Sequence, residues 1–228
     1  MRDASAGLEV LLLRRSRHSG FVPEMYVFPG GRVDASDADP AAWLDDLTLH
    51  EAAVRLDLMD AAPPAIAYFV AGFREAFEET GILLGSLVNG SPPPTAADDP
   101  AVDLVRAELM DGRIGFAEAL ARMECRIKGT AVEYIAHWIT PLRQPRRFDT
   151  RFFAARVEGS STPIVDPREM TDARWVTPAQ ALAAHALGNL PMILPTVHTL
   201  ERLGAFGSAA ETLEALARET VVTIMPGG

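Results

Sequence analysis

Short apolar runs and amphipathic stretches alternate along this chain without a fixed period. Apolar, β-branched and aromatic runs predict strands at residues 8–13, 26–28, 134–140, 152–157 and 173–176. Apolar positions three or four apart predict helices at 40–60, 65–80, 100–126 (one or two helices), 178–187, 195–203 and 208–219. Because strands and helices alternate without a regular βαβ repeat, we predict an α/β fold with a mixed sheet and helices packed on both faces.

The segment 65–80 has the strongest amphipathic pattern in the chain. Its apolar stripe consists of Ile66, Phe69, Val70, Phe73 and Phe77, and Gly81 follows as a helix-ending residue. Glu75, Glu78 and Glu79 are spaced i, i+3 and i+4, so a helix places all three carboxylates on one side, away from the apolar stripe. The pattern therefore predicts a buried helix with an acidic outer face.

Composition and charge limit the class of protein. The 228 residues are 48% hydrophobic and 23% charged, which is typical of a globular protein and predicts a single domain over 1–228. A formal net charge of −10 argues against a nucleic-acid partner, but an acidic enzyme can bind an anionic substrate through a divalent cation. The single cysteine, Cys125, is expected to be a buried apolar residue between helical neighbours. We find no signal peptide and no membrane-spanning run, so we expect a cytoplasmic protein with no membrane partner.

Three neighbouring carboxylates repel one another unless a cation lies between them. Magnesium and manganese prefer such oxygen ligands, and Arg74 is placed to reach Glu78 and to orient Glu75. The alternative is a solvated helix face with ordinary ion pairs. The upstream Phe28–Pro29–Gly30–Gly31 favours the metal site, since glycine lets backbone carbonyls approach a ligand closely.

These residues carry a family resemblance. The run Arg74-Glu75-Ala76-Phe77-Glu78-Glu79-Thr80-Gly81-Ile82 resembles the second half of the Nudix box at every fixed position, and Phe28-Pro29-Gly30-Gly31 resembles the strand and loop that open it. The resemblance implies a Nudix-type α/β/α sandwich with a mixed sheet. It also implies hydrolysis of a diphosphate linkage in a nucleotide-containing small molecule.

The chain departs from the usual box in its first half. About 29 extra residues separate Gly31 from Arg74, which we interpret as a helical insertion at about 35–63, and extra C-terminal helices are expected at about 190–220. The glutamate usual in the first half has no clear counterpart, although Asp34 or Asp37 stands nearby. The inserted segment is expected to add core, with a lid or pocket wall as the alternative.

The resemblance also implies the roles of the site residues. Glu75, Glu78, Glu79 and the carbonyl of Gly31 would bind one to three Mg²⁺ ions, with Mn²⁺ as a substitute. Glu75, held by Arg74, is one candidate for the base that activates water. Glu169 or Asp166 in a later loop is the rival.

Features along most of the chain narrow the resemblance to the acyl-coenzyme A diphosphatase branch of Nudix enzymes. They are the insertion, the lead-in LLLRRS, FVPxxxVFPGG, Arg147-Phe148-Asp149-Thr150-Arg151-Phe152-Phe153 and Trp175-Val176-Thr177-Pro178. The implied products are 3′,5′-ADP and (acyl-)4′-phosphopantetheine. Arg15, Arg32 and Arg147 are the expected substrate-binding residues. The implied 3′-phosphate needs cationic partners, and two basic clusters could supply them, with a solvated surface as the alternative: Arg14, Arg15 and Arg17, or Arg143, Arg146, Arg147 and Arg151. The coenzyme A signature is incomplete, because Gly20 and Glu24 stand where it has an arginine and a glycine.

The sequence also leaves alternative functions open. ADP-ribose, NADH or a dinucleoside polyphosphate would need the same metal site with a different pocket. An isopentenyl diphosphate isomerase would need a catalytic cysteine, and Cys125 has no such context. A nucleotide-sensing Nudix module would tend to lose box carboxylates, whereas this chain keeps all three. A homodimer is left open.

Overall fold

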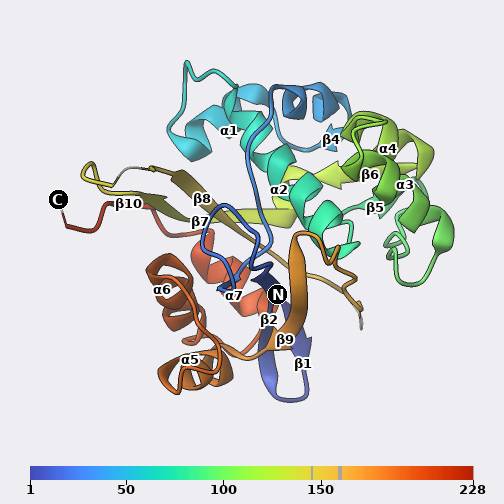
Figure 1. Cartoon of the computed structure of the whole chain (residues 1–228). Coiled ribbons are helices and arrows are strands. Elements are labelled where there is room, and N and C mark those ends of the chain that lie inside the picture. The colour runs from blue at the N-terminus through green and yellow to red at the C-terminus, as the bar shows by residue number, and fades with distance from the viewer. Residues whose placement is uncertain (145, 159–160, 228) are drawn as a thin grey trace.

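Two sheets stand between two layers of helices (Figure 1). The computed structural model describes residues 1–144, 146–158 and 161–227, without the side chains of 40–42. The first sheet contains β1 (Arg2–Ala4), β2 (Gly7–Arg15), β3 (Tyr26–Val27) and β9 (Met170–Val176), each neighbour running antiparallel to β2. The second contains β7 (Val132–Ile139), β8 (Asp149–Ala155) and β10 (Thr223–Ile224). Because β8 is antiparallel and β10 parallel to β7, this sheet is mixed, as predicted.

One helical layer contains the helix that carries the acidic motif. It consists of the 3₁₀ helix η1 (Ala35–Trp43), α1 (Leu49–Leu56), α2 (Ala65–Thr80), α3 (Pro100–Met110), α4 (Phe116–Arg122) and the 3₁₀ turn η2 (Gly129–Ala131). A small sheet of β4 (Leu44–Asp45), β5 (Ser86–Leu87) and β6 (Cys125–Lys128) lies beside these helices. Phe69, Phe73 and Phe77 of α2 are fully buried in the core of this layer, so the predicted stripe and helix are confirmed.

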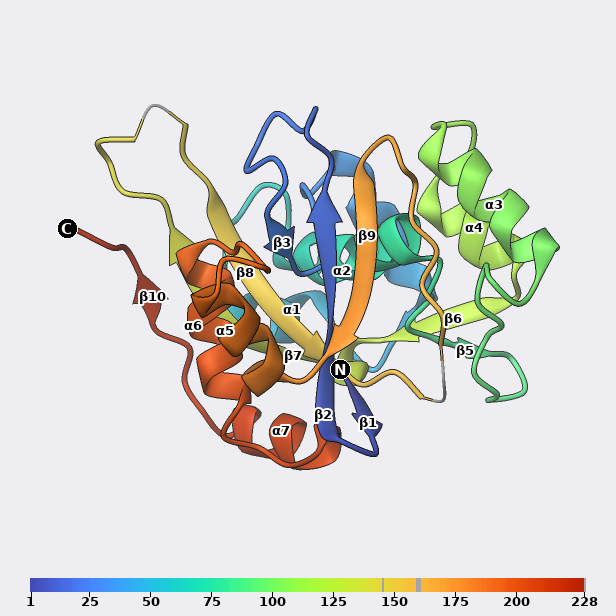
Figure 2. The same ribbon diagram turned by 60° about the horizontal axis from the view of Figure 1, so that its bottom comes forward.

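The other layer lies on the opposite side of the sheets. It consists of α5 (Pro178–Ala186), α6 (Leu194–Leu203) and α7 (Ala209–Leu216), which lie in front of the sheets in Figure 2, while α2 lies behind them. Leu12 of β2 and Trp138 of β7 pack with Leu200 of α6 in a second core. The two cores on opposite sides of the sheets give the α/β/α sandwich. No helix in the described part of the chain has both the length and the apolar composition to cross a bilayer.

The inserted segment differs from the single helix predicted at 40–60. It forms η1, then β4, and a new helix starts only at Leu49. Thr48 ends the extended stretch because its hydroxyl accepts from the Glu51 N–H while the Glu51 carboxylate accepts from the Thr48 N–H, a reciprocal cap. Parallel pairing of Leu44 with Ile127 in β6 holds the residues before it extended. The prediction of one continuous helix at 40–60 was wrong, because the local spacing of apolar residues does not reveal this long-range pairing.

Cys125 is buried, as predicted, but not between helical neighbours. It starts β6 and pairs with Leu87 of β5, so that part of the prediction was wrong. Burial raises the pKa of its thiol to about 11. The side chain therefore behaves as a small apolar core residue rather than a reactive nucleophile.

Candidate active site

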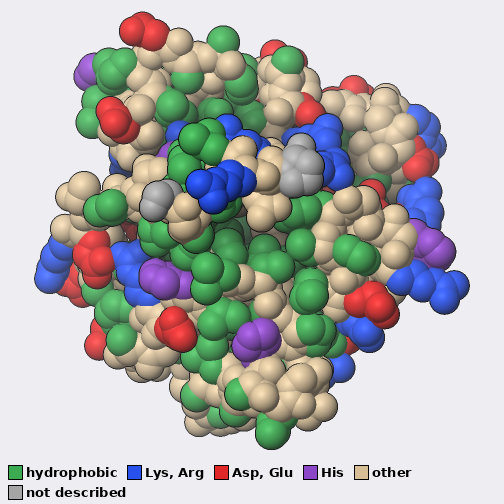
Figure 3. Space-filling model, turned by 60° about the vertical axis from the view of Figure 1, so that its left-hand side comes forward, with side chains coloured by type: hydrophobic (Ala, Val, Ile, Leu, Met, Phe, Trp, Pro, Cys, Tyr) green, Lys and Arg blue, Asp and Glu red, His purple; other side chains and the backbone are tan. Residues whose placement is uncertain are grey.

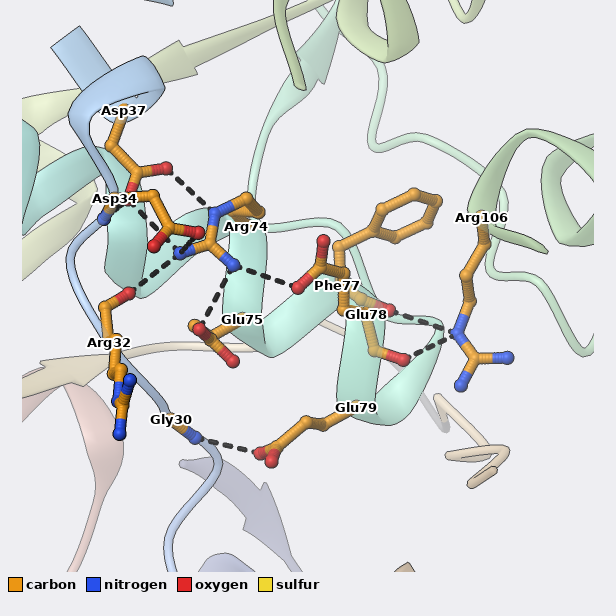
Figure 4. A network of polar contacts seen from close by, with 10 residues as sticks. All are labelled: Gly30, Arg32, Asp34, Asp37, Arg74, Glu75, Phe77, Glu78, Glu79 and Arg106. Carbon is orange, nitrogen blue, oxygen red and sulfur yellow. Dashed lines mark hydrogen bonds and ion pairs between the residues drawn. The ribbon is translucent and has the colours of Figure 1, made fainter. Parts of the chain in front are cut away.

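Arg74 is the centre of a polar network on the outer face of α2 (Figure 4). Its Nε donates to Asp37 Oδ1 at 2.7 Å and its Nη2 to Asp37 Oδ2 at 3.0 Å, so the two side chains form a bidentate ion pair. Asp37 is 1% exposed, whereas the side chain of Asp34 is 64% exposed and 3.8 Å from Arg74. Burial therefore distinguishes the two aspartates: Asp37 is the buried partner of Arg74, and Asp34 stays at the surface.

The same guanidinium holds two of the three glutamates. Nη1 donates to Glu75 Oε1 and to Glu78 Oε2, each at 2.9 Å, which confirms that Arg74 reaches Glu78 and orients Glu75. Nη2 also donates to the carbonyl of Arg32 at 2.8 Å, which fixes the loop after Gly31 against α2. Burial lowers the pKa of Arg74, but the hydrogen bond to Asp37 and the nearby carboxylates outweigh it and raise the pKa overall. Arg74 is thus a permanent cation that orders the acidic face.

The Gly30–Gly31 loop lies directly over the carboxylates. The Gly30 N–H donates to Glu79 Oε2 at 2.8 Å. A Cβ added at Gly31 would stand 2.2 Å from Glu75 Oε1, closer than any side chain can approach. The atoms in the way are the flexible end of the Glu75 side chain, so a Cβ at Gly31 would displace this carboxylate, and the absence of a side chain lets the backbone pack close to it.

Burial makes the acidic face electrostatically costly. Desolvation raises the pKa of Glu75 to about 7, with a further contribution from Glu78. It raises the pKa of Glu79 to about 8 and raises that of Glu78 as well. The negative charge of Glu169 contributes to the shifts of both Glu78 and Glu79, so the exposed Glu169 lies within electrostatic reach of the motif. Buried carboxylates that are costly to ionise are the environment in which a divalent cation stabilises the charged forms.

The carboxylate oxygens on α2 are the kind of ligand that a hard divalent cation prefers, although in this structure they accept hydrogen bonds from Arg74 and from the Gly30 N–H. Glu75 and Glu79 point toward the Gly30–Arg32 loop, and Glu78 points toward Arg74 (Figure 4). Within the described ranges, no three His, Cys, Asp or Glu side chains are gathered closely enough to hold an ion. The oxygen ligands and the Gly31 backbone suit Mg²⁺ or Mn²⁺ in kind, and metal binding would require these side chains to turn toward one point.

Arg106 of α3 is a site residue that the sequence reasoning missed. Its Nε donates to the carbonyls of Phe77 at 3.2 Å and Glu78 at 2.8 Å, so a buried cation caps the C-terminal turn of α2. Its Nη2 is 3.4 Å from the carbonyl of Ile164, in the segment leading to Glu169. The sequence did contain a signal for it: Arg106 lies four residues after Val102 and three before Leu109, so it faces the same buried side of the helix.

A cavity of about 1170 Å³ opens beside the acidic face. The Gly30–Arg32 loop and Glu75 form part of its lining, and Phe28, which follows β3, and the aromatic residues Phe152 and Phe153 of β8 form another part. Phe28 and Phe152 meet there edge to face at 6.2 Å between ring centres. Figure 3 shows the face over β7, β8 and α6 hollowed near its middle, with hydrophobic side chains gathered around the hollow. A diphosphate at Glu75 would therefore have an extended, largely apolar space beside it.

The predicted substrate-binding arginines lie in different places. Arg15 and Arg32 both line the cavity. Arg15 donates to the Ser19 hydroxyl and the Phe21 carbonyl, and its charge lowers the pKa of Glu79, which places it near the motif. Arg147 is exposed, donates to the Thr140 carbonyl and lies outside the cavity lining.

The two candidate bases in the later loop also differ. Asp166 is bound to Arg168, whose hydrogen bond lowers the pKa of this carboxyl. Glu169 has its backbone anchored to β2 by the Ser16 N–H, while its side chain is exposed. Of the two, Glu169 is the one whose carboxylate forms no ion pair with the described residues, and its charge reaches the glutamates of α2.

Comparisons with known proteins agree with this geometry. A family model for the NUDT19 Nudix domain matches residues 2–66 and 52–203. Acyl-coenzyme A diphosphatase NUDT19 of Xenopus laevis is 28% identical over 92% of this chain, and that of Homo sapiens is 28% identical over 90%. The chain spans 63% of the length of each of these two relatives. The crystal structure of a NUDIX hydrolase from Alicyclobacillus acidocaldarius is similar with a TM-score of 0.74 and 27% identity, covering 96% of this chain and 93% of that one. The chain belongs to the Nudix hydrolase family, and within it to the group described by the NUDT19 Nudix domain.

Proposed function

We propose that this protein hydrolyses the diphosphate linkage of coenzyme A or an acyl-coenzyme A, giving 3′,5′-ADP and (acyl-)phosphopantetheine. The observation that carries the proposal is the group of buried and half-buried glutamates on α2 beside the Gly30–Gly31 loop, of which Glu75 lines a large cavity. The relatives named acyl-coenzyme A diphosphatase support the choice of substrate. The apolar part of the cavity suits a pantetheine arm or acyl chain better than a second nucleoside.

Mg²⁺, with Mn²⁺ as its substitute, would be held by Glu75, Glu78, Glu79 and the carbonyl of Gly31. Bound there, the cation supplies charge neutralisation for the diphosphate and lowers the pKa of the attacking water. Arg74 keeps Glu75 and Glu78 in place through its Nη1, and Asp37 fixes the orientation of that guanidinium. Arg74 therefore holds Glu75 and Glu78 on one side of α2, from which they would turn toward a bound cation.

A carboxylate must accept the proton of the attacking water. Glu75 is the first candidate because it lies at the cavity wall and is held by Arg74. Glu169 is the second, since its carboxylate is exposed near Glu78 and Glu79. Arg15 and Arg32 would bind phosphate oxygens at the cavity, whereas the position of Arg147 offers it a place only at the periphery.

The proposal is tested with a hydrolysis panel in the presence of Mg²⁺, Mn²⁺ or a chelator. Coenzyme A, an acyl-coenzyme A, ADP-ribose, NADH and a dinucleoside polyphosphate are incubated with wild type, Glu79→Gln and Glu169→Gln, and products are separated by chromatography. Metal-dependent release of 3′,5′-ADP by wild type, lost in Glu79→Gln, is the expected result. Cleavage of ADP-ribose or NADH alone would retain the Nudix chemistry and refute the coenzyme A substrate.

A further inference from the structure

Arg151 lines the cavity, and one of its guanidinium nitrogens has no hydrogen-bond partner among the described residues. It lies in β8, its side chain is 6% exposed, and it lines the same cavity as Glu75. Its Nη1 donates to Asp149 Oδ1 at 2.7 Å, and its Cζ is 4.9 Å from the centre of the Tyr68 ring. The hydroxyl of Tyr134 also forms a hydrogen bond with the guanidinium. These contacts fix the position and orientation of the arginine.

The Nε of Arg151 is buried and has no hydrogen-bond partner among the described residues. A buried N–H donor without an acceptor is destabilising, so its retention needs an explanation. Nε and Nη2 form the edge with which a guanidinium binds two oxygens of a carboxylate or phosphate side by side. Asp149 is bound at Nη1, so it orients the guanidinium and leaves Nε without a partner.

Asp149 is itself held by a second donor. His137 of β7 pairs through Nε2 with Asp149 Oδ1 at 2.7 Å, and its Nδ1 is 2.8 Å from the Thr223 hydroxyl of β10. The carboxylate that orients Arg151 is thus shared with an imidazole, which leaves the cation less fully neutralised than in a simple pair. By contrast, Arg15 and Arg146 at the cavity rim donate to serine or backbone oxygens of the chain.

The position of Arg151 relative to the acidic motif is set by α2. Tyr68, Gly72 and Glu75 are spaced i, i+4 and i+7, so they follow one side of the helix, and all three line the cavity. Seven residues of helix span about 10 Å, so Arg151 above Tyr68 lies about that far along α2 from Glu75. Gly72 contributes no side chain between them. One continuous wall therefore connects the proposed diphosphate position to the guanidinium of Arg151.

We propose that Arg151 binds a second anionic group of the substrate, the phosphate monoester on the nucleoside half, and thereby makes the enzyme prefer 3′-phosphorylated substrates. The inference rests on the proposed function, because coenzyme A carries this phosphate in addition to its diphosphate. ADP-ribose and NADH lack it. Arg151 is a binding residue in this scheme and takes no part in the cleavage step.

The test compares coenzyme A with 3′-dephospho-coenzyme A in wild type, Arg151→Gln and Arg151→Lys. Wild type should show a KM for coenzyme A about 10-fold or more below that for the dephospho form. Arg151→Gln should raise the KM for coenzyme A by about 10-fold to 100-fold and leave that for the dephospho form within about 2-fold. Arg151→Lys should recover part of the preference, since it restores the charge without the two-pronged edge.

Arg156→Gln is the matched control, because Arg156 forms an exposed ion pair with Asp3 and lies outside the cavity lining. It should leave the substrate preference unchanged. Equal loss of activity on both substrates in Arg151→Gln, together with a lowered Tm, would mean that the arginine only ties β8 to Tyr68 and would overturn the proposal. Absence of any preference in wild type would do the same.

A binding measurement separates this inference from the proposed function. Titration calorimetry with 3′,5′-ADP and with 5′-AMP needs no hydrolysis. Tighter binding of 3′,5′-ADP by wild type, lost in Arg151→Gln, supports the anion site even if no substrate of the panel is cleaved. Equal binding of the two nucleotides overturns it even if coenzyme A is hydrolysed.

Discussion

The pair between Arg74 and Asp37 connects the two halves of the motif across the inserted segment, and its removal should be costly. Asp37→Ala eliminates two hydrogen bonds from Arg74 and one from the Asp34 N–H, at 2.7, 3.0 and 2.7 Å. Removing one partner of a buried ion pair generally costs about 3–5 kcal/mol. Because Arg74 keeps its bonds to Glu75 and Glu78, we expect the lower part of this range, about 3 kcal/mol.

Equilibrium unfolding in urea, followed by tryptophan fluorescence and circular dichroism, measures this loss. Asp34→Ala is the matched control: its carboxylate is 3.8 Å from Arg74 and its side chain is 64% exposed, so it should cost less than about 1 kcal/mol. The Asp34 N–H that bonds to Asp37 is backbone and survives the substitution. Equal effects of the two variants, or a cost of Asp37→Ala below about 1 kcal/mol, would refute the assignment of Asp37 as the buried partner.

Three further predictions follow from contacts around the site. Gly31→Ala places a Cβ against the flexible end of Glu75, so we expect kcat/KM to fall by about 100-fold with little change in Tm, while Gly115→Ala, where the added atom meets open space, should leave kcat/KM unchanged. Arg106→Met removes the cation that caps the end of α2 and should lower the free energy of unfolding by about 1–3 kcal/mol, with Arg106→Lys intermediate; a urea titration in which Met and Lys behave like wild type would contradict the capping role. The Cys125 thiol, with a pKa raised to about 11 by burial, holds little thiolate at pH 8, so native protein should react with a disulfide reagent far more slowly than urea-unfolded protein, and equal rates would show that the thiol is accessible.

The local pattern of the sequence determined the element that carries the chemistry. Apolar residues three or four apart along 65–80 gave a helix with the bounds Ala65–Thr80, and Gly81 ends it with a φ of 70°. The same spacing put Glu75, Glu78 and Glu79 within reach of Arg74 and of the Gly30–Gly31 loop. These features are predictable because a helix converts sequence spacing directly into direction.

Only the tertiary structure decided the features that depend on distant segments. Asp37 rather than Asp34 meets Arg74 because η1 and β4 turn the inserted segment back against α2, and that turn depends on pairing with β6. Arg106 reaches the end of α2 from a separate helix, and Arg151 enters the cavity because β8 packs beside Tyr68. Nothing in the local periodicity encodes these contacts. They arise when the burial of two separate cores fixes how the helices sit on the sheets, so charge partners and cavity walls become defined only after the chain has packed.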